Sequence, residues 1–271
     1  MEMKNKYEKL LETIRPYGKA IVAFSGGVDS TLLAYAAAEA LGRENALCVT
    51  ASALSFPARE LKEAEAFCEG QGIRHEVVRF DELGVDGFAA NPPNRCYLCK
   101  SALFSKFKAL AEKEGIEAVL EGSNSDDTDD YRPGMQAIRE LGVHSPLQAA
   151  GLSKEEVRAI LRALGQPVWD KPPLACLATR FPYGEKITAE KLGMADRAEQ
   201  FLFDRGCRQT RVRVHGSENF TARIEAMPEE IEGLAEEPLR GEIDRYFKTL
   251  GFTWVALDLT GYRTGSMNEV L

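Results

Sequence analysis

The sequence predicts an α/β protein with a doubly wound, mainly parallel sheet, followed by a smaller C-terminal α+β domain. Short apolar runs alternate with segments of helical pattern along the first half of the chain, as parallel βαβ units require. From about residue 171 a proline-rich segment without periodicity interrupts this alternation, and a different order of strands and helices follows it. We therefore expect a boundary near Gly184 and two domains, 1–184 and 185–271.

The expected elements of the first domain follow one another in βαβ order, and the expected strands are short and rich in apolar residues. Ser153 and Glu156 form a capping box that begins a further helix. Because the carboxyl ends of parallel strands meet at one rim, the polar segments 25–30, 50–52 and 121–127 should lie together. The strands are expected at 21–24, 46–49, 75–80 and 118–120, and the helices at 31–41, 57–71 and 97–114.

The remainder of the chain predicts a small α+β module. A helix is expected at 189–205, strands at 210–214 and 222–226, one or two helices within 228–250 and a last strand at 253–259.

Composition excludes some classes of function. No stretch approaches the roughly 18 apolar residues that span a bilayer, and the charged amphipathic start lacks a secretory signal pattern, so we expect a cytoplasmic protein without membrane partners. The formal charge of −8, from 34 basic and 42 acidic side chains, gives no overall attraction to nucleic acid. The 6 scattered cysteines favour reduced thiols, metal binding or catalysis over a disulfide framework.

The segment SGGVDS, residues 25–30, predicts a phosphate-binding turn between the first strand and the first long helix. Gly26 and Gly27 allow the backbone to approach an anion closely, and Ser25 and Ser30 offer hydroxyl groups. The turn lacks the spacing and the lysine of a Walker loop, which disfavours γ-phosphoryl transfer. The alternative interpretation is an ordinary Ser/Gly turn between two buried elements.

SGGVDS resembles the PP-loop of the ATP pyrophosphatase superfamily, whose members cleave ATP between the α- and β-phosphates and form an adenylate. The resemblance implies that residues 25–30 bind ATP, with Asp29 beside Mg²⁺ and with Asp29 and Ser30 as candidate catalytic residues. Ser52 and Asp126 lie at the same expected rim and are further candidate contacts. The acidic run from Asp126 to Asp130 is either a second source of Mg²⁺ ligands or a solvated loop.

Three cysteines stand in proline- and arginine-rich surroundings rather than in apolar ones. Cys96 and Cys99 form a CxxC at the start of an expected helix, which is half of a metal site or a complete redox pair. Cys176 lies in the proline-rich segment, with Arg180 nearby to stabilise a thiolate. Three thiolates can hold a [4Fe–4S] cluster and leave one iron open. The other three are expected in the core: Cys48, Cys68 and Cys207.

Two arginines alternate on an expected strand of the second domain. Arg211 and Arg213 therefore point to the same side, where two guanidinium groups could bind a phosphate, although an exposed strand face is the ordinary alternative. Glu199 and Glu225 are candidate partners for ion pairs or for a metal ion, and the residues alone do not choose between these roles.

Five segments together resemble the LarE family of ATP-dependent sulfur transferases, which mature the nickel-pincer nucleotide cofactor of lactate racemase. The resemblance runs from about residue 15 to the C-terminus. It implies that ATP adenylates a carboxylate of a pyridinium dicarboxylate mononucleotide, and that sulfur then replaces the activated oxygen. The five segments are SGGVDS, NPPNRCYLCK, EGSNSDDTDDYRPG, KPPLACLATRFPYG and RVRVHG.

The resemblance also implies residue roles. Cys176 matches the sulfur-bearing cysteine, Arg211 and Arg213 match the arginines that bind the substrate phosphate, and Glu199 and Glu225 resemble carboxylates of a metal site. Some members of the family sacrifice the sulfur of the single later cysteine, and others also have the CxxC and hold a [4Fe–4S] cluster that carries sulfide. This chain has all three thiols, so the cluster-bearing form is predicted.

Other interpretations stay open beside this one. A tRNA-thiolating PP-loop enzyme should show a basic RNA-binding face, and an amide-forming ligase resembling NAD synthetase would not need the three loop cysteines. A non-enzymatic nucleotide-binding Fe–S carrier would bind ATP without releasing pyrophosphate. The sequence allows a homo-oligomer and does not identify the physiological sulfur donor.

Overall fold

The computed structural model describes residues 2–128, 133–173 and 175–269, which fall into two compact units. Unit 1 comprises Met1–Phe80 and Cys96–Leu174, and unit 2 comprises Asp81–Arg95 and Ala175–Leu271. The units differ from the sequence-based division near Gly184, because the segments 81–95 and 175–184 belong with the C-terminal residues. The division into 1–184 and 185–271 stays a prediction.

Unit 1 is built on a four-stranded sheet in the order β3-β2-β1-β4, in which all neighbouring strands are parallel. This arrangement confirms the α/β class predicted from the alternating pattern. The chain order reverses beside β1, since β2 pairs with one of its edges and β4 with the other. Such a reversal leaves a crevice at the carboxyl ends of the strands, where ligands bind in open α/β sheets. The strands are β1 (Ala20–Ala23), β2 (Ala46–Ser52), β3 (Arg74–Arg79) and β4 (Ala118–Leu120).

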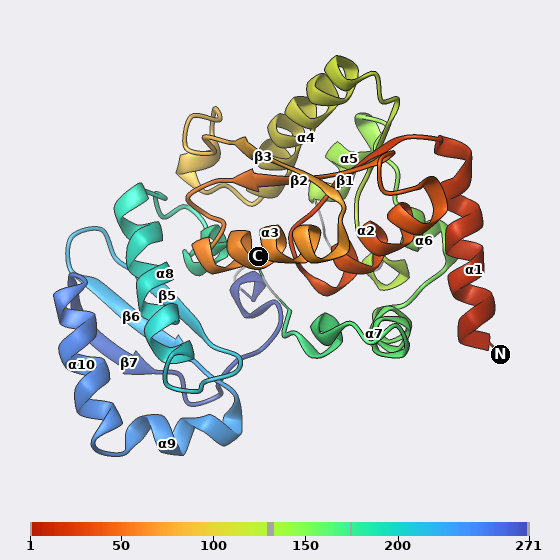
Figure 1. The fold of residues 1–271 in the computed structure, drawn as a ribbon. Coiled ribbons are helices and arrows are strands. Elements are labelled where there is room, and N and C mark those ends of the chain that lie inside the picture. The colour runs from red at the N-terminus through yellow and green to blue at the C-terminus, as the bar shows by residue number, and fades with distance from the viewer. Residues whose placement is uncertain (1, 129–132, 174, 270–271) are drawn as a thin grey trace. The chain divides into compact units, whose positions relative to one another are not determined.

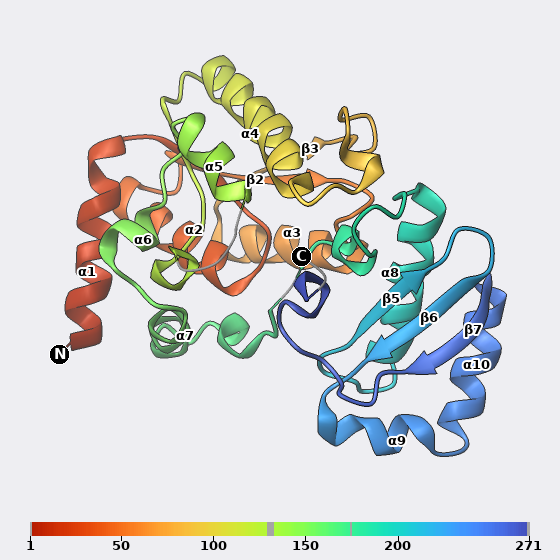
Figure 2. The ribbon, with the colours of Figure 1, turned by 180° about the vertical axis from the view of Figure 1, so that it is seen from behind.

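Helices cover both faces of this sheet, with α4 and α5 on one side and α2 and α3 on the other (Figures 1 and 2). Alternate strand residues face the two layers. Ile21 and Val49 pack with α4 and α5, whereas Val22 and Cys48 pack with α1, α2 and α3. The helices of unit 1 are α1 (Glu2–Ile14), α2 (Val28–Leu41), α3 (Ala58–Gln71), α4 (Arg95–Glu114), α5 (Pro133–Glu140), α6 (Pro146–Ala150) and α7 (Lys154–Ala163); the first residue of α4, Arg95, is counted with unit 2.

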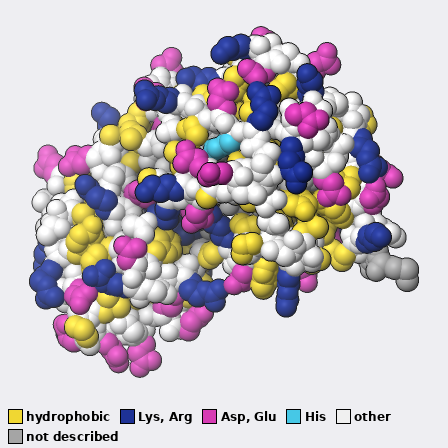
Figure 3. Space-filling view, in the orientation of Figure 1, with side chains coloured by type: hydrophobic (Ala, Val, Ile, Leu, Met, Phe, Trp, Pro, Cys, Tyr) yellow, Lys and Arg dark blue, Asp and Glu magenta, His cyan; other side chains and the backbone are white. Residues whose placement is uncertain are grey.

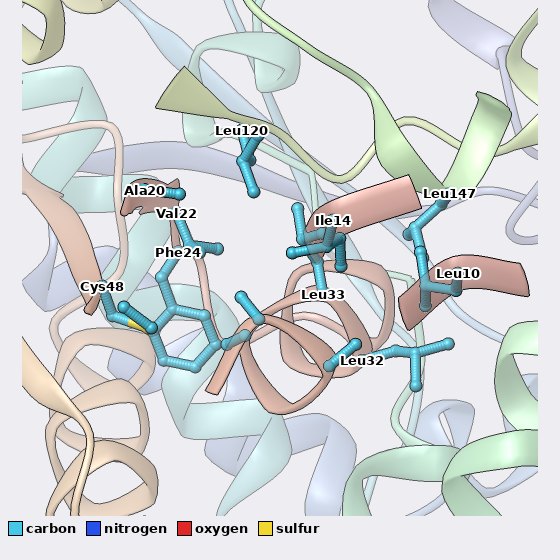
Figure 4. Packing of buried hydrophobic residues seen from close by; sticks show 14 of the residues in the cluster. Leu10, Ile14, Ala20, Val22, Phe24, Leu32, Leu33, Cys48, Leu120 and Leu147 are labelled. Carbon is cyan, nitrogen blue, oxygen red and sulfur yellow. The ribbon is translucent and has the colours of Figure 1, made fainter. Parts of the chain in front are cut away.

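Helix α2 lies at the centre of the larger apolar cluster of unit 1 (Figure 4). Leu32 and Leu33 are fully buried among side chains that include Leu10 and Ile14 of α1 and Leu147 of α6. The helix is rich in alanine, so it packs closely on several sides without a polar face. This packing fixes the first turn of α2, and with it the loop that precedes the helix.

The capping box predicted at Ser153 is confirmed. The Ser153 hydroxyl accepts a hydrogen bond from the Glu156 backbone N–H at 3.3 Å, and the Glu156 carboxylate accepts one from the Ser153 N–H at 3.0 Å. These bonds satisfy two donors at the start of α7 and fix the residue that follows the cap, Lys154. Helices α5 and α6 were not predicted, because each is too short to show a clear helical period.

Unit 2 contains a three-stranded mixed sheet, as the prediction of a smaller α+β domain required. Strand β6 pairs antiparallel with β5 and parallel with β7. Phe247 of α10 packs against Phe252 of β7 with ring centroids 5.7 Å apart, which joins a helix to the sheet. The elements are α8 (Ala189–Phe203), β5 (Arg211–His215), β6 (Phe220–Glu225), α9 (Ile231–Ala235), α10 (Leu239–Thr249) and β7 (Phe252–Leu257).

The surface carries mixed charge. On the face shown in Figure 3, lysine and arginine side chains are interspersed with aspartate and glutamate rather than gathered into one basic field. Within the described part of the chain, no helix is long and apolar enough to cross a membrane.

A buried ion pair joins α8 to the segment before it in unit 2. The carboxylate of Glu199 is fully buried and accepts hydrogen bonds from Arg180 Nε at 2.6 Å and Nη2 at 3.0 Å. Burial alone would raise the pKa of Glu199. The charge and hydrogen bonds of Arg180, the charge of Arg211 and the Val212 N–H outweigh burial, so the pKa of this carboxyl lies below its usual value.

We predict that Glu199→Gln makes unfolding less pH-dependent in the acid range. The pKa of Glu199 is lower in the folded protein than in the unfolded one, where a glutamate has a pKa of about 4.3. The charged carboxylate therefore contributes its full stability above the unfolded pKa. This stability is lost as the pH falls through the folded pKa. At pH 7 the variant should lose about 3–5 kcal/mol, because the Arg180 charge stays buried without its counter-ion.

Urea unfolding of both proteins between neutral and acid pH measures this difference. Glu190→Gln, at an exposed position of the same helix, is the matched control and should follow the wild type. Parallel pH profiles for wild type and Glu199→Gln would contradict the linkage.

Candidate active site

The segment between β1 and α2 forms a tight turn at the predicted rim of the sheet. Gly27 is the N-cap of α2, and Gly26 adopts φ +67°, a left-handed conformation that side chains disfavour. This conformation brings Gly26 against α3, where an added Cβ would lie 3.6 Å from both Ala64 and the Glu60 carbonyl. The turn therefore needs glycine at position 26, and it leaves the first N–H groups of α2 facing outward from the helix end.

The two serines of the turn stabilise it through each other. Their hydroxyl oxygens lie 3.1 Å apart, and the Ser25 N–H donates to the Ser30 hydroxyl at 3.2 Å. Ser30 in turn donates to the Gly27 carbonyl at 3.1 Å. The serines therefore preorganise the turn, and the exposed Ser25 hydroxyl is available to exchange one partner for a phosphate oxygen.

Asp29 is held by two groups from other segments of unit 1. Its carboxylate forms an ion pair with Lys154 and accepts a hydrogen bond from the Asn124 amide at 3.2 Å. Sequence reasoning missed Lys154, although the capping box at Ser153 places this lysine at the first position of α7. A lysine therefore does reach this phosphate-binding turn, but it comes from a distant helix and not from a Walker motif.

A cavity of about 380 Å³ opens at the carboxyl ends of β1, β2 and β4, where the sheet order reverses. Its lining includes the polar turn residues Ser25, Asp29 and Ser30. The lining also includes apolar side chains, among them Phe104 and Phe107 of α4. A lining that combines a phosphate-binding turn with aromatic side chains suits a nucleotide, because the base can pack while the phosphates are hydrogen-bonded.

Two of the predicted contacts lie outside the lining of this cavity. Ser52 uses its carbonyl to accept a hydrogen bond from Phe80 at 2.9 Å, which extends the ladder between β2 and β3. Asp126 is exposed and accepts the backbone N–H of Lys154 at 2.8 Å, whereas its neighbour Asp127 does line the cavity. The roles proposed for Ser52 and Asp126 stay predictions, and Asp129 and Asp130 lie outside the described residues.

The CxxC lies on the helix that lines the nucleotide-sized cavity. Cys96 is exposed and Cys99 is partly buried in the first turn of α4. Lys100, Leu103 and Phe107 follow Cys96 at helical spacing, and all three line the cavity. Helix α4 therefore carries the two thiols about one turn from the edge of the cavity. The sequence suggested Lys100 as a cation beside the CxxC thiols, but not as a residue that lines the cavity.

Lys171 is a third lysine that sequence reasoning missed in unit 1. Its ammonium group donates to the Gly26 carbonyl at 3.2 Å and forms ion pairs with Glu60, at 2.6 Å, and Glu63 of α3. It thereby fastens the phosphate-binding turn to α3. The pKa of Glu60 is nevertheless raised, because burial outweighs the opposing effect of Lys171.

A second cavity, of about 180 Å³, lies within unit 2 and is rich in arginine. Arg211 and Arg213 both line it, together with Arg95 and Arg263. The two strand arginines are only 3% and 5% exposed, so they do not form the solvated strand face that was the ordinary alternative. The structure thus brings Arg211 and Arg213 together as predicted and adds two arginines from segments distant in sequence.

The arginine-lined cavity has hydrogen-bonding capacity left over. Arg213 donates to the Thr179 carbonyl at 2.9 Å and to Glu225 at 2.6 Å, yet its Nε is buried without a hydrogen-bond partner among the described residues. Nη1 of Arg263 is likewise buried without a hydrogen bond in the described part of the chain. Burial and the charge of Arg180 lower the pKa of Arg211 to about 10. An anion in the cavity would relieve both the missing hydrogen bonds and the crowding of positive charge.

The two candidate metal carboxylates both face guanidinium groups. Glu199 pairs with Arg180, and Glu225 pairs with Arg213 at 2.6 Å and with Arg223 at 3.0 Å. The described residues contain no group of three or more His, Cys, Asp or Glu side chains that could hold a metal ion. The metal role of Glu199 and Glu225 stays a prediction of the sequence.

Cys176 is exposed in unit 2, in a turn directly beside the arginine-lined cavity. Its carbonyl accepts hydrogen bonds from the Thr179 N–H at 2.9 Å and the Thr179 hydroxyl at 2.8 Å. The preceding residue, Ala175, lines the cavity. Because Cys96 and Cys99 belong to unit 1, the meeting of the three thiols at one cluster stays a prediction. The other cysteines are buried, as expected: Cys48, Cys68 and Cys207.

Comparison with known proteins agrees with this geometry. A family model for NAD synthase matches residues 3–87, the part that contains the phosphate-binding turn. The chain is 45% identical to an uncharacterized protein of Synechocystis sp., over 99% of both chains. It is also 35% identical to pyridinium-3,5-bisthiocarboxylic acid mononucleotide synthase of Lactiplantibacillus plantarum, over 99% of this chain and 96% of that protein. With a match of this extent to the synthase, and with the PP-loop in its predicted place, the chain belongs to the LarE family.

Proposed function

We propose that this protein is an ATP-dependent sulfur transferase. Its substrate would be a pyridinium-3,5-dicarboxylate mononucleotide, whose carboxylates become thiocarboxylates for the nickel-pincer nucleotide cofactor of lactate racemase. The observation that carries the proposal is an arginine-lined cavity directly beside Cys176, in a chain that also has a PP-loop cavity. The first site suits a phosphorylated substrate next to a sulfur atom, and the second suits ATP.

The PP-loop cavity supports adenylation. The substrate carboxylate would attack the α-phosphorus of ATP, the bond to the β-phosphate oxygen would break, and pyrophosphate would leave with the bonding electrons. Asp29 and Asp127 line the cavity and fit Mg²⁺, which is bound in proteins by one or two carboxylates together with phosphate oxygens. Lys154 and the N–H groups of α2 would balance the charge of the phosphates.

The second half of the reaction replaces oxygen with sulfur. A sulfur nucleophile would attack the carbonyl carbon of the acyl adenylate, and the C–O bond to AMP would break, so that AMP leaves. If Cys176 were the nucleophile, the product would be a thioester. Loss of the Cys176 α-proton would then break the Cβ–S bond, release the thiocarboxylate and leave dehydroalanine. The exposed position of Cys176 fits either this sacrificial role or a role as a cluster ligand.

The three thiols fit a [4Fe–4S] cluster as a donor set. Cys96 and Cys99 are one helical turn apart at an accessible helix start, and Cys176 is exposed in a turn, so none of them is committed to an apolar core. When bound, such a cluster would supply a sulfide at the iron without a cysteine ligand, so that Cys176 would not be consumed. Because all 6 cysteines are thiols, we propose the reducing cytoplasm as the location.

An amide-forming ligase is the second candidate, and the match to the NAD synthase model favours it. That match covers the ATP-binding part alone, whereas Cys176 and the strand arginines lie outside it. A tRNA-thiolating enzyme is disfavoured by the formal charge of −8 and by the mixed charges in Figure 3. Product analysis with ammonia or sulfide as the nucleophile donor distinguishes the ligase from the sulfur transferase.

We predict that the protein converts ATP into AMP and pyrophosphate when Mg²⁺ and the carboxylated mononucleotide are present. Asp29→Ala should abolish this activity, because the variant loses a candidate Mg²⁺ ligand and the partner of Lys154. Asp86→Ala, at an exposed position outside the cavity, should leave it unchanged. Chromatography of the nucleotide products measures the outcome, and formation of ADP and orthophosphate would contradict the PP-loop mechanism.

We predict that Cys96, Cys99 and Cys176 bind one [4Fe–4S] cluster. Replacement of any of them by alanine should lower the iron content and the cluster absorbance of anaerobically reconstituted protein, whereas Cys48→Ala should lower neither. If the wild type binds no cluster, the sacrificial route applies. Intact mass after turnover should then show the loss of H₂S from Cys176.

We predict that Arg211→Ala and Arg213→Ala each raise the KM for the nucleotide substrate by about one to two orders of magnitude, since a hydrogen bond to a charged group contributes roughly 1.5–3 kcal/mol. Lysine at either position should rescue only partly, because it lacks the planar fork. The KM for ATP is the internal control, and Arg197→Ala, exposed on α8, is the matched variant. An unchanged substrate KM in both variants would place the substrate phosphate elsewhere.

A further inference from the structure

The turn that contains Cys176 is held from inside unit 2 by one guanidinium group. Nη1 of Arg180 donates to the carbonyl of Ala175 at 3.2 Å, to the carbonyl of Cys176 at 3.3 Å and to the Thr179 hydroxyl at 2.8 Å. The Cys176 carbonyl therefore accepts from three donors, since the N–H and the hydroxyl of Thr179 also point to it. The side chain of Cys176 is therefore exposed, while its backbone is held by several hydrogen bonds.

The other side of the same guanidinium group is fixed by Glu199. Arg180 is only 2% exposed and uses Nε and Nη2 to bind both oxygens of the Glu199 carboxylate. One of these oxygens also accepts the backbone N–H of Val212 at 3.0 Å, and Val212 lies between Arg211 and Arg213 in β5. A single carboxylate therefore joins the cysteine turn to the strand that lines the arginine-lined cavity.

A third contact closes this network. Arg213 donates from Nη1 to the carbonyl of Thr179 at 2.9 Å, so the strand also contacts the turn directly. Buried ion pairs add little net stability, because desolvation offsets much of their attraction. They do restrict geometry, and a displacement of about 1 Å at a reacting group can cost roughly a hundredfold in rate. The network is therefore better suited to positioning than to stabilisation.

We propose that Arg180 and Glu199 are positioning residues, which hold the Cys176 backbone in a fixed place relative to the arginine-lined cavity. The inference rests on the proposed function, in which sulfur at Cys176 must meet a substrate whose phosphate is bound by Arg211 and Arg213. It gives Glu199 a role as the counter-ion of Arg180 rather than as a metal ligand. Adenylation uses the PP-loop cavity of unit 1, so at saturating nucleotide substrate it should not depend on this pair.

The test separates the two half-reactions in Arg180→Lys, Thr179→Val and Thr179→Ser. Lysine keeps a positive charge beside Glu199, but its single ammonium group cannot hydrogen-bond to the Glu199 carboxylate and to the two backbone carbonyls of the cysteine turn at the same time. Valine removes the Thr179 hydroxyl without burying a charge, and serine restores that hydroxyl. Thiocarboxylate formation should fall about tenfold or more in the lysine and valine variants and recover in the serine variant. At saturating nucleotide substrate, pyrophosphate release should stay at wild-type values, and so should the KM for ATP.

Arg197→Lys, on the exposed side of α8, is the matched control and should leave both half-reactions unchanged. Unchanged sulfur transfer in both Arg180→Lys and Thr179→Val would overturn the proposal. An equal fall in both half-reactions at saturating substrate would also overturn it.

Hydrogen exchange of the full-length protein tests the same inference without any activity. Amides of residues 175–180 should exchange faster in Arg180→Lys and Thr179→Val than in the wild type. In Thr179→Ser these amides should exchange as they do in the wild type. Amides of β7 should exchange at the same rate in every variant. Equal exchange in all variants would show that the pair does not hold the turn. If no protein releases pyrophosphate, the proposed function fails, and the exchange result still decides the positioning role.

Discussion

The phosphate-binding site depends on one constraint, which is that the first N–H groups of α2 must remain without helical partners at the carboxyl end of β1. Gly26 meets this constraint with a φ of +67°, and Lys171 ties the Gly26 carbonyl to α3. The full burial of Leu32 and Leu33 prevents α2 from sliding along its axis. Sheet order, helix packing and the glycine turn therefore combine to direct one helix end into one cavity.

The candidate site of unit 2 is built from buried charged side chains, whereas the phosphate-binding turn of unit 1 presents backbone N–H groups. Around β5, three buried arginines (Arg180, Arg211 and Arg213) face the two fully buried carboxylates of Glu199 and Glu225. Burial and the positive charge of Arg180 lower the pKa of Arg211 to about 10, as expected where cations outnumber nearby anions. A charge distribution of this kind favours an anionic ligand over an empty cavity.

The sequence predicted the elements whose signals are local. The βαβ order, the PP-loop and the capping box at Ser153 each occupy a short continuous segment, and the structure contains all three. Lys154 and Arg263 were missed because each reaches its cavity through tertiary packing, which leaves no pattern near it in the sequence. The same reason explains why the residues alone left Glu199 open between an ion pair and a metal site. Its partner Arg180 comes from another segment, and only the fold reveals their pairing.

The unmet hydrogen bonds of unit 2 have an energetic consequence. Nε of Arg213 and Nη1 of Arg263 are buried without hydrogen-bond partners among the described residues, and a buried unsatisfied donor costs about 1–3 kcal/mol, more when the group is charged. A more stable unit would place carboxylates there, but those carboxylates would repel a phosphorylated substrate. An anion bound in the cavity would recover part of this cost, and incomplete satisfaction of this kind is common at functional sites. The bidentate pair of Arg180 and Glu199 lies directly behind this region and keeps the Cys176 turn fixed while the cavity itself remains incompletely satisfied.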